Sequence, residues 1–246
     1  MKIKILYEDS NILAIDKPSG ILVHPDQRSK SKTVLDLFLK KYPKLEIVHR
    51  LDKETSGVML LAKNKKAHEF FKNQFQNREI KKIYNTIVSG FVKNDHVIIN
   101  KPIGRSPKDF RRRLAGRGAR GEMREAITHF KVLKRFEAPS SEIFSRVTHP
   151  KKGRTLATKK SQKTALEKFS YLEISPKTGR THQIRVHMKF INHPIVCDSL
   201  YNPDNPCPKG INRLALHAKS IEFKNLKGKI IKVESPLPKE FKSIIS

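Results

Sequence analysis

The chain has 246 residues and a mass of 28.3 kDa, enough for one large domain or two small ones with a full core. Its 52 lysines and arginines outnumber 23 aspartates and glutamates, and the net charge of +29 favours nucleic acid or an anionic membrane surface as partner. No apolar run approaches the ~20 residues that span a bilayer, and the amino terminus lacks the apolar core of a signal peptide. We therefore expect a cytoplasmic protein without a membrane span.

Hydrophobic periodicity and turn residues predict many strands and few helices. Thr33 and Asn64 are typical helix caps, and further helices are predicted to begin at Thr181 and at Pro238. Because no regular βαβ alternation is present, we expect the α+β class, with residues 1–246 forming a single mainly antiparallel mixed-sheet domain with flanking helices and basic loops. The predicted strands are 3–7, 12–16, 21–25, 82–90, 97–100, 125–133, 169–174, 214–216, 221–223 and 230–233, and the predicted helices are 33–42, 64–77, 181–191 and a short terminal one.

Two strongly basic stretches interrupt this pattern. Residues 108–124 contain six arginines and three glycines with almost no apolar content, so we expect a segment outside the core. It is either a solvated flexible loop or an arm that orders on nucleic acid, and the charge favours the arm, with Arg111, Arg112 and Arg113 on phosphates. Residues 139–164 are interpreted as a long surface excursion.

The chain has two cysteines, Cys197 and Cys207, which we expect to be reduced structural thiols. A zinc site that also uses His193 and His217 has a spacing that matches no common ligand pattern. No metal site is therefore predicted.

A carboxylate, Asp52, lies in a short polar turn between the apolar residues 47–48 and 58–62. Two buried strands on either side of this turn would hold Asp52 rigidly at the end of a sheet, beside Arg50. Taken alone, an aspartate in such a place is more often one that caps the turn. The stretch by itself leaves the choice between a catalytic and a structural carboxylate open.

Two distant segments supply possible partners for Asp52. In the segment 178–187 a helix beginning near Thr181 puts His182 and Arg185 on one face, and that arginine could form a bidentate pair that keeps Asp52 ionised. Tyr84, on its strand, would offer a flat surface on which a base can stack. Each also has an ordinary explanation: His182 as a helix-start residue, Arg185 as a surface helix residue, and Tyr84 as a half-buried aromatic residue of a strand.

These segments together resemble a known family. The nine residues from His49 to Gly57 match all seven fixed positions of the H-R-L-D-x-x-T-S-G signature of RluA-type RNA pseudouridine synthases. Departures are Cys197 and Asn202, where the family usually has glycine, and the two basic stretches, about 108–124 and 139–164, which look like insertions. We expect no S4 RNA-binding domain, since there is no room before residue 5. The resemblance follows the family's order through residues 7–25, 82–90, 178–187, 193–201 and 213–218.

The resemblance implies an RNA pseudouridine synthase that breaks the N1–C1′ bond of a uridine and rejoins the uracil through C5, with no metal or organic cofactor. It implies that Asp52 acts at the ribose of a flipped-out uridine, by attack on C1′ or removal of the C2′ proton. Arg185 is expected to pair with Asp52, and Tyr84 to pack on the uracil and help remove the C5 proton.

Further residues are expected to bind the RNA. Arg50 is interpreted as a wedge for the vacated base position and Leu216 as apolar lining, while the basic loops contact phosphates without reading sequence. The other residues expected at the substrate are Thr55, Arg180 and His182. The expected partner is a ribosomal RNA or tRNA stem-loop, bound by a monomer.

Two other classes stay open at this point. The first is a non-catalytic RNA-binding protein, against which the joint presence of Asp52, Tyr84 and Arg185 argues. The second is a glycosylase or nuclease, which would normally need a second acid or metal ligands nearby.

Overall fold

The computed structural model describes residues 3–25, 31–140, 166–205 and 207–246. The helices are α1 (Val34–Phe38), α2 (Lys65–Gln76), α3 (Gln183–Phe190) and α4 (Lys239–Ile245). The strands are β1 (Lys4–Glu8), β2 (Ile12–Lys17), β3 (Glu46–Ile47), β4 (Ser56–Ala62), β5 (Lys81–Ser89), β6 (His96–Asn100), β7 (Ile103–Arg105), β8 (Arg113–Ala115), β9 (Arg120–Arg124), β10 (Ile127–Pro139), β11 (Leu166–Pro176), β12 (Leu216–Lys224) and β13 (Ile230–Glu234).

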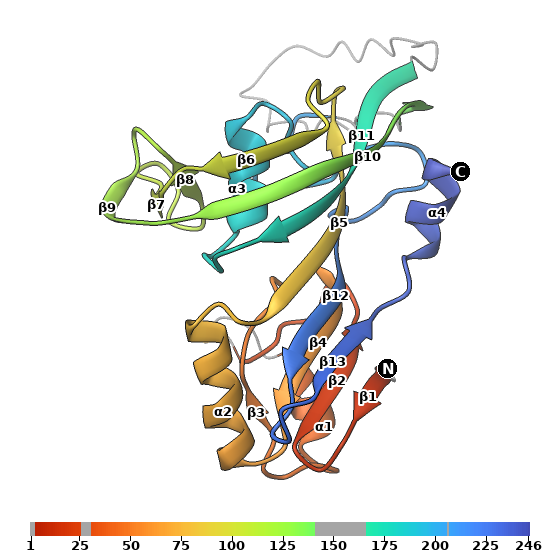
Figure 1. The fold of residues 1–246 in the computed structure, drawn as a ribbon. Helices are drawn as coiled ribbons and strands as arrows, with labels where there is room; N and C mark the ends of the chain where they lie inside the picture. Colours follow the sequence, from red (N-terminus) through yellow and green to blue (C-terminus); the bar gives the residue numbers. More distant parts are fainter. Residues whose placement is uncertain (1–2, 26–30, 141–165, 206) are drawn as a thin grey trace, which may run out of the picture.

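One large mixed sheet organises the molecule (Figure 1). Its strands run in the order β1-β2-β4-β12-β5-β11-β10-β6, with β13 beside β12 and β3 beside β4. The pairing of β12 with β4 is parallel, and every other pairing of named strands in the described ranges is antiparallel. The predicted α+β class with a mainly antiparallel mixed sheet is confirmed.

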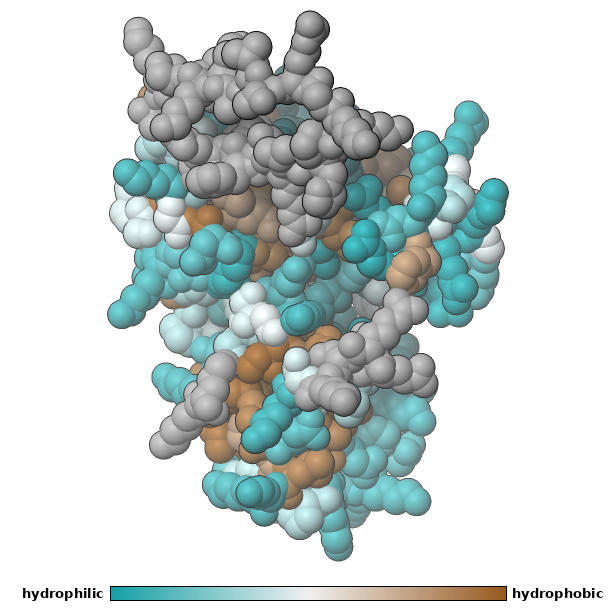
Figure 2. Space-filling model, turned by 180° about the vertical axis from the view of Figure 1, so that it is seen from behind, coloured by the Kyte–Doolittle hydropathy of each residue, from teal (hydrophilic) through white to brown (hydrophobic). Residues whose placement is uncertain are grey.

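The sheet carries two main hydrophobic clusters. The first surrounds β2 and β4 with α1 and α2, and the second lies around β5, β11 and α3. Figure 2, which views the opposite side, shows apolar side chains gathered in the lower half with hydrophilic side chains around them. Tyr84 packs against both clusters, so the middle of β5 marks the junction between the two halves.

Local sequence signals account for most of the elements. Thr33 closes a capping box with Asp36 at the start of α1, and the Asn64 side chain accepts the Ala67 N–H at 2.9 Å at the start of α2. All seven residues of β4 are buried because β2, β3 and β12 pair with it. A run of apolar residues without alternation is typical of such a central strand.

Several predicted elements differ from the structure, and a single strand, β12, stands in place of the strands predicted at 214–216 and 221–223. Residues 21–25 are not a strand, since the carbonyl of Leu22 accepts the Val34 N–H at 2.8 Å and so bonds to the start of α1. Helix α1 ends at Phe38 rather than Tyr42, and α3 begins after His182 rather than at Thr181. The predicted excursion at 139–164 lies almost entirely outside the described residues.

Residues 108–124 were expected outside the core, as a flexible loop or as an arm that orders on nucleic acid, but the structure forms strands there and buries Ala115. Strands β8 and β9 of this segment flank β7 in a second, three-stranded sheet, which we call the Arg-rich hairpin (residues 103–124). Gly116 and Gly118, both with positive φ, form the turn between β8 and β9, and Ala115 is buried in a small cluster with Val186 of α3. Backbone pairing orders the segment even though arginine is its most frequent residue and apolar side chains are few.

The prediction of two reduced thiols is also wrong. Cys197 and Cys207 are joined by a disulfide, with Cα atoms 5.2 Å apart. None of the helices in the described part of the chain is both long and apolar enough to cross a bilayer.

Candidate active site

Asp52 lies in the loop between β3 and β4, at the junction of the two halves. Its side chain is 21% exposed, and its backbone carbonyl accepts the N–H of Thr55 at 3.1 Å, which closes a tight turn. The same turn is also held by the segment that follows β2, where Ser19 donates to the carbonyl of Glu54 at 2.6 Å and the N–H of Gly20 donates to that of Lys53 at 2.8 Å. The loop that carries Asp52 is therefore held on both sides.

Lys17 lies beneath this loop and is completely buried. Its ammonium donates to the backbone carbonyls of Pro18, Lys53 and Thr55 at 3.0, 2.9 and 2.8 Å. Burial lowers the pKa of Lys17 to about 7, against the opposing charge of Asp52. The three carbonyls match the three donors of the ammonium, so this lysine ties the loop that carries Asp52 to the end of β2.

Gly57 lets the loop meet the neighbouring strand. It pairs with Ala218 across the parallel β4–β12 contact and has φ +111°. A Cβ atom at this position would lie 2.2 Å from the carbonyl oxygen of Ala218. The glycine of the signature is therefore required by the close approach of two backbones.

Arg185, on the first turn of α3, brings three carboxylates together. Its side chain is 4% exposed, and it makes two hydrogen bonds of 2.7 Å to Asp198, which is fully buried. Its Nη1 lies 3.6 Å from Asp52 Oδ2, and its Nη2 lies 3.3 Å from Glu54. Burial opposes the charge of Arg185, but Asp198 first, then Asp52 and Glu54, raise its pKa.

The predicted contact between Arg185 and Asp52 is thus present, but the predicted bidentate geometry is not. The bidentate partner is Asp198, because the loop that follows α3 returns beneath the guanidinium and holds Asp198 with two backbone N–H groups, those of Leu200 and Tyr201. Asp52 keeps a longer contact and faces open space.

That space is a cavity of about 550 Å³ between the two halves. Its volume is in the range of sites for small ligands. Asp52, Tyr84, Arg185 and Leu216 all line it, so the structure brings these four predicted residues together from four separate segments. Burial, with the charge of Asp52, raises the pKa of Tyr84, so its hydroxyl stays protonated.

The remaining predicted substrate residues lie around the same cavity. Arg50, Thr55, Arg180 and His182 line it, Arg50 being exposed and Thr55 buried. Arg180 donates from Nε to the carbonyl of Glu125 at 2.9 Å, which fixes its direction.

His182, expected at the substrate, does not fit its ordinary alternative as a helix-start residue bonded to the backbone. It is the N-cap of α3, but its side chain makes no capping bond and its backbone is left-handed, with φ 56°. Its Nε2 lies 3.9 Å from Asp52 Oδ1, and its Nδ1 lies 3.0 Å from the hydroxyl of Tyr201.

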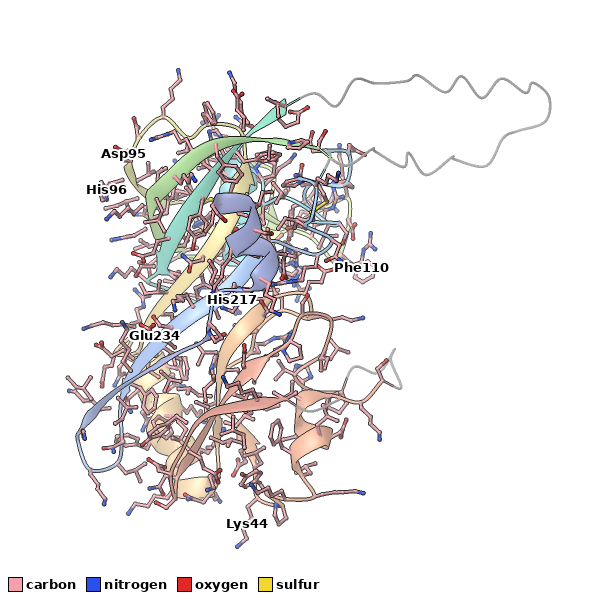
Figure 3. The ribbon with its side chains drawn as sticks, turned by 90° about the vertical axis from the view of Figure 1, so that its right-hand side faces the viewer. Lys44, Asp95, His96, Phe110, His217 and Glu234 are labelled. Carbon is pink, nitrogen blue, oxygen red and sulfur yellow. A yellow bond between two sulfur atoms is a disulfide. The ribbon has the colours of Figure 1, made fainter. Side chains whose placement is uncertain are left out.

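The three predicted phosphate contacts lie outside the cavity, on the Arg-rich hairpin. Asp109 pairs with Arg111 at 2.8 Å and with Arg112 at 3.7 Å. Arg113 donates its backbone N–H to the Tyr201 hydroxyl at 2.9 Å. Phe110, 69% exposed, projects at the edge of the molecule beside these arginines (Figure 3).

Sequence reasoning missed three residues of the site: Lys17, Asp198 and Tyr201. The sequence placed each of them in a segment that follows the order of segments in the family, but it gave none of them a role at the site. The one local signal was a lysine directly before a proline at the end of an apolar strand, where a charged residue is unusual.

Comparison with known proteins places this geometry in a family. The family described as RNA pseudouridylate synthase matches residues 11–190. The chain is 32% identical to the uncharacterized RNA pseudouridine synthase YlyB of Bacillus subtilis (strain 168), an alignment that covers 100% of this chain and 72% of that protein. The chain belongs to the RNA pseudouridylate synthase family.

A second relative is longer than this chain. Ribosomal large subunit pseudouridine synthase D of Neisseria meningitidis serogroup B (strain ATCC BAA-335 / MC58) is 35% identical over 100% of this chain, which spans 61% of the length of that relative. Two solved human structures have a similar fold. The first is human RNA pseudouridylate synthase domain containing 1, with a TM-score of 0.74 and 23% identity, and the alignment covers 96% of this chain and 84% of that one. The second is human RNA pseudouridylate synthase domain containing 4, with a TM-score of 0.68 and 25% identity, and the alignment covers 97% of this chain and 90% of that one.

Proposed function

We propose that this chain is an RNA pseudouridine synthase that isomerises a specific uridine to pseudouridine. The observation that carries the proposal is a carboxylate, Asp52, that lines a cavity together with Tyr84 and with Arg185, 3.6 Å away, in a chain that belongs to the family. The reaction exchanges an N1–C1′ bond for a C5–C1′ bond. The uracil loses a proton at C5 and gains one at N1, so no redox partner is needed.

In this proposal the target uridine leaves its stack and enters the cavity. Asp52 acts at the ribose, as a nucleophile at C1′ or as a base at C2′, and Arg185 orients it. Tyr84 packs on the uracil with its protonated hydroxyl, and Leu216 supplies an apolar wall. Arg50, exposed beside the cavity, fills the space that the base leaves.

The RNA is bound by the positive surface. We propose a ribosomal RNA or tRNA stem-loop as target, and the name of the Neisseria relative favours large-subunit ribosomal RNA. We further propose a monomer in the cytoplasm, with residues 1–246 as one catalytic domain. The continuous sheet through both halves supports one domain, and self-repulsion at a net charge of +29 supports a monomer.

Asp52→Asn tests the catalytic proposal, with the charge removed and the shape kept. We expect the purified variant to bind RNA as wild type does but to form no pseudouridine in RNA from a strain lacking the gene. Chemical mapping of that RNA, in ribosomal and tRNA fractions separately, identifies the target. A variant that modifies RNA at the wild-type rate would refute the role of Asp52. Wild-type protein that binds RNA but never modifies it would instead favour the non-catalytic RNA-binding class.

A second experiment tests the Arg-rich hairpin as a phosphate-binding surface. Changing Arg111, Arg112 and Arg113 together to alanine removes side chains but leaves the backbone pairing of β8. We expect weaker RNA binding and a slope of log K against log salt smaller by about two to three, since each lost phosphate contact lowers it by about 0.7 to 0.9. Alanine at Lys227 and Lys229, in the exposed turn between β12 and β13, is the matched control. An unchanged slope in the triple variant would contradict the assignment.

A further inference from the structure

Tyr201 connects the Arg-rich hairpin to the active site. The residue is 5% exposed and lies in the loop after α3. Its hydroxyl is 2.9 Å from the backbone nitrogen of Arg113, in β8, and 3.0 Å from Nδ1 of His182. The guanidinium of Arg185 lies 5.1 Å from the centre of its ring. One phenol thus contacts the hairpin and both residues that flank Asp52.

The direction of these hydrogen bonds follows from the donors available. The Arg113 amide can only donate, so the Tyr201 oxygen accepts there. Burial raises the pKa of Tyr201 to about 12, and burial lowers the pKa of His182, so the phenol keeps its proton and the imidazole is neutral. Of the two partners of the hydroxyl, Nδ1 of His182 is the one that can accept, so donation of the phenol proton satisfies it there and places the imidazole hydrogen on Nε2.

That Nε2–H faces the catalytic carboxylate. It lies 3.9 Å from Asp52 Oδ1, about 1 Å beyond hydrogen-bond length, while Oδ2 faces Arg185 at 3.6 Å. Asp52 therefore has a neutral donor on one side and a cation on the other. The charged groups that surround His182 are Asp52, Arg185, Asp198 and Arg113.

The backbone of His182 supports a functional rather than a capping role. A non-glycine residue in the left-handed region costs about 1–2 kcal/mol, and such strain is concentrated at functional sites. The side chain does not cap α3; its ring meets that of Tyr201 edge to face, with centroids 5.7 Å apart and planes at 84°. The strained backbone is thus used to direct the imidazole between Tyr201 and Asp52.

We propose that Tyr201 is a positioning residue which, anchored on the backbone of the Arg-rich hairpin, holds His182 as the Nε2–H tautomer facing Asp52. The inference rests on the proposed function. It adds a relay in which two hydrogen bonds join Arg113 to Tyr201 and Tyr201 to His182, and the Nε2–H of His182 faces the catalytic carboxylate at 3.9 Å. The hairpin thereby contributes to the geometry of Asp52 through its backbone, separately from any phosphate contact of its side chains.

Tyr201→Phe removes the hydroxyl but keeps the ring on which Arg185 stacks. We expect kcat to fall about tenfold or more, because misplacement of a catalytic group by a fraction of an ångström is sufficient for such a loss, with RNA affinity unchanged. Nitrogen-15 NMR of the histidine side chains reads the tautomer directly, with His182→Gln used to assign the signal. In wild type we expect the hydrogen of the His182 ring on Nε2 and none on Nδ1. In Tyr201→Phe we expect a mixture of both tautomers.

A pair of variants at His182 separates the relay from a purely structural role. The amide nitrogen of Gln reaches the position of Nε2, whereas that of Asn reaches only Nδ1, so the relay predicts that His182→Gln keeps more kcat than His182→Asn. A backbone role predicts the reverse order, since Asn tolerates the left-handed conformation better.

Three results would overturn the inference: hydrogen on Nδ1 in wild-type His182, an unchanged kcat in Tyr201→Phe, or higher turnover in His182→Asn than in His182→Gln. The NMR result does not depend on turnover. Failure of the proposed function would instead appear as pseudouridine formation by Asp52→Asn or none by wild type.

Discussion

Asp198→Asn tests whether the buried charge network of Arg185 organises the site. The substitution keeps the shape of Asp198 but removes the charge that makes two 2.7 Å bonds to a guanidinium whose side chain is 4% exposed. Breaking a buried pair costs about 3–5 kcal/mol. Asp52 and Glu54 stay near Arg185, and the Asn oxygen can still accept backbone bonds, so we expect a loss of about 2–3 kcal/mol in the free energy of unfolding.

Turnover is expected to fall as well. Without the Asp198 charge, the nearest carboxylate to Arg185 is Glu54 at 3.3 Å, and movement of the guanidinium toward it leaves Asp52 misplaced. We expect kcat to decrease about 10- to 100-fold, the size of effect that a displacement of about 1 Å produces. Urea unfolding followed by circular dichroism gives the loss of stability, and single-turnover assays on unmodified RNA from a strain lacking the gene give the change in turnover.

The matched control is Glu69→Gln, which neutralises a surface acid on α2 that lies 3.7 Å from Lys72. Both side chains are about half exposed, so the control should change stability by less than about 1 kcal/mol. If Asp198→Asn behaved like this control in both assays, the network would not be what holds Arg185.

Two further predictions concern the surroundings of the site. Gly57→Ala places a Cβ 2.2 Å from the Ala218 oxygen at φ +111°, so we expect the free energy of unfolding to fall by about 3 kcal/mol or more. The control is Gly228→Ala, which has open space at φ +78° and should lose about 1–2 kcal/mol. Equal losses in thermal unfolding would contradict the close approach at Gly57. Burial, with the charge of Arg213, lowers the pKa of His217 to about 4 from 6.5, so protonation favours the unfolded chain as pH falls below 6.5. Urea unfolding should show that wild type loses about 2 kcal/mol more than His217→Asn between pH 7 and pH 5, and the same loss in both proteins would refute this cause.

The elements that the sequence predicted well are those specified by short-range chemistry. The caps Thr33 and Asn64 locate two helix starts because their side chains bond within three residues. The turn at Asp52 was predicted because polar residues interrupt two apolar runs that become β3 and β4. The resemblance of this turn to a family signature then connected Asp52 with Tyr84 and Arg185. Hydrophobic periodicity alone gives no relation between these three residues.

The sequence predicted less where a partner is chosen in three dimensions. Lys17 and Asp198 are charged residues that the fold buries completely, and burial of a charge depends on partners from distant segments. The Arg-rich hairpin was misread because composition reports side chains, whereas β8 and β9 are ordered by backbone hydrogen bonds to β7. Which acid takes the bidentate bond of Arg185 depends on the return of the loop after α3, and spacing alone does not reveal that return.

The division of tasks between Asp198 and Asp52 has a chemical reason. A carboxylate that accepts two 2.7 Å bonds from a guanidinium has its oxygens occupied and is a poorer nucleophile or base. Asp198 takes those bonds and is fully buried, so the guanidinium is fixed without using the lone pairs of Asp52. Asp52 then keeps a cation at 3.6 Å, close enough to orient it, and remains 21% exposed to the cavity. The two acids should therefore separate in experiment: neutralising Asp52 abolishes turnover with little loss of stability, whereas neutralising Asp198 reduces both.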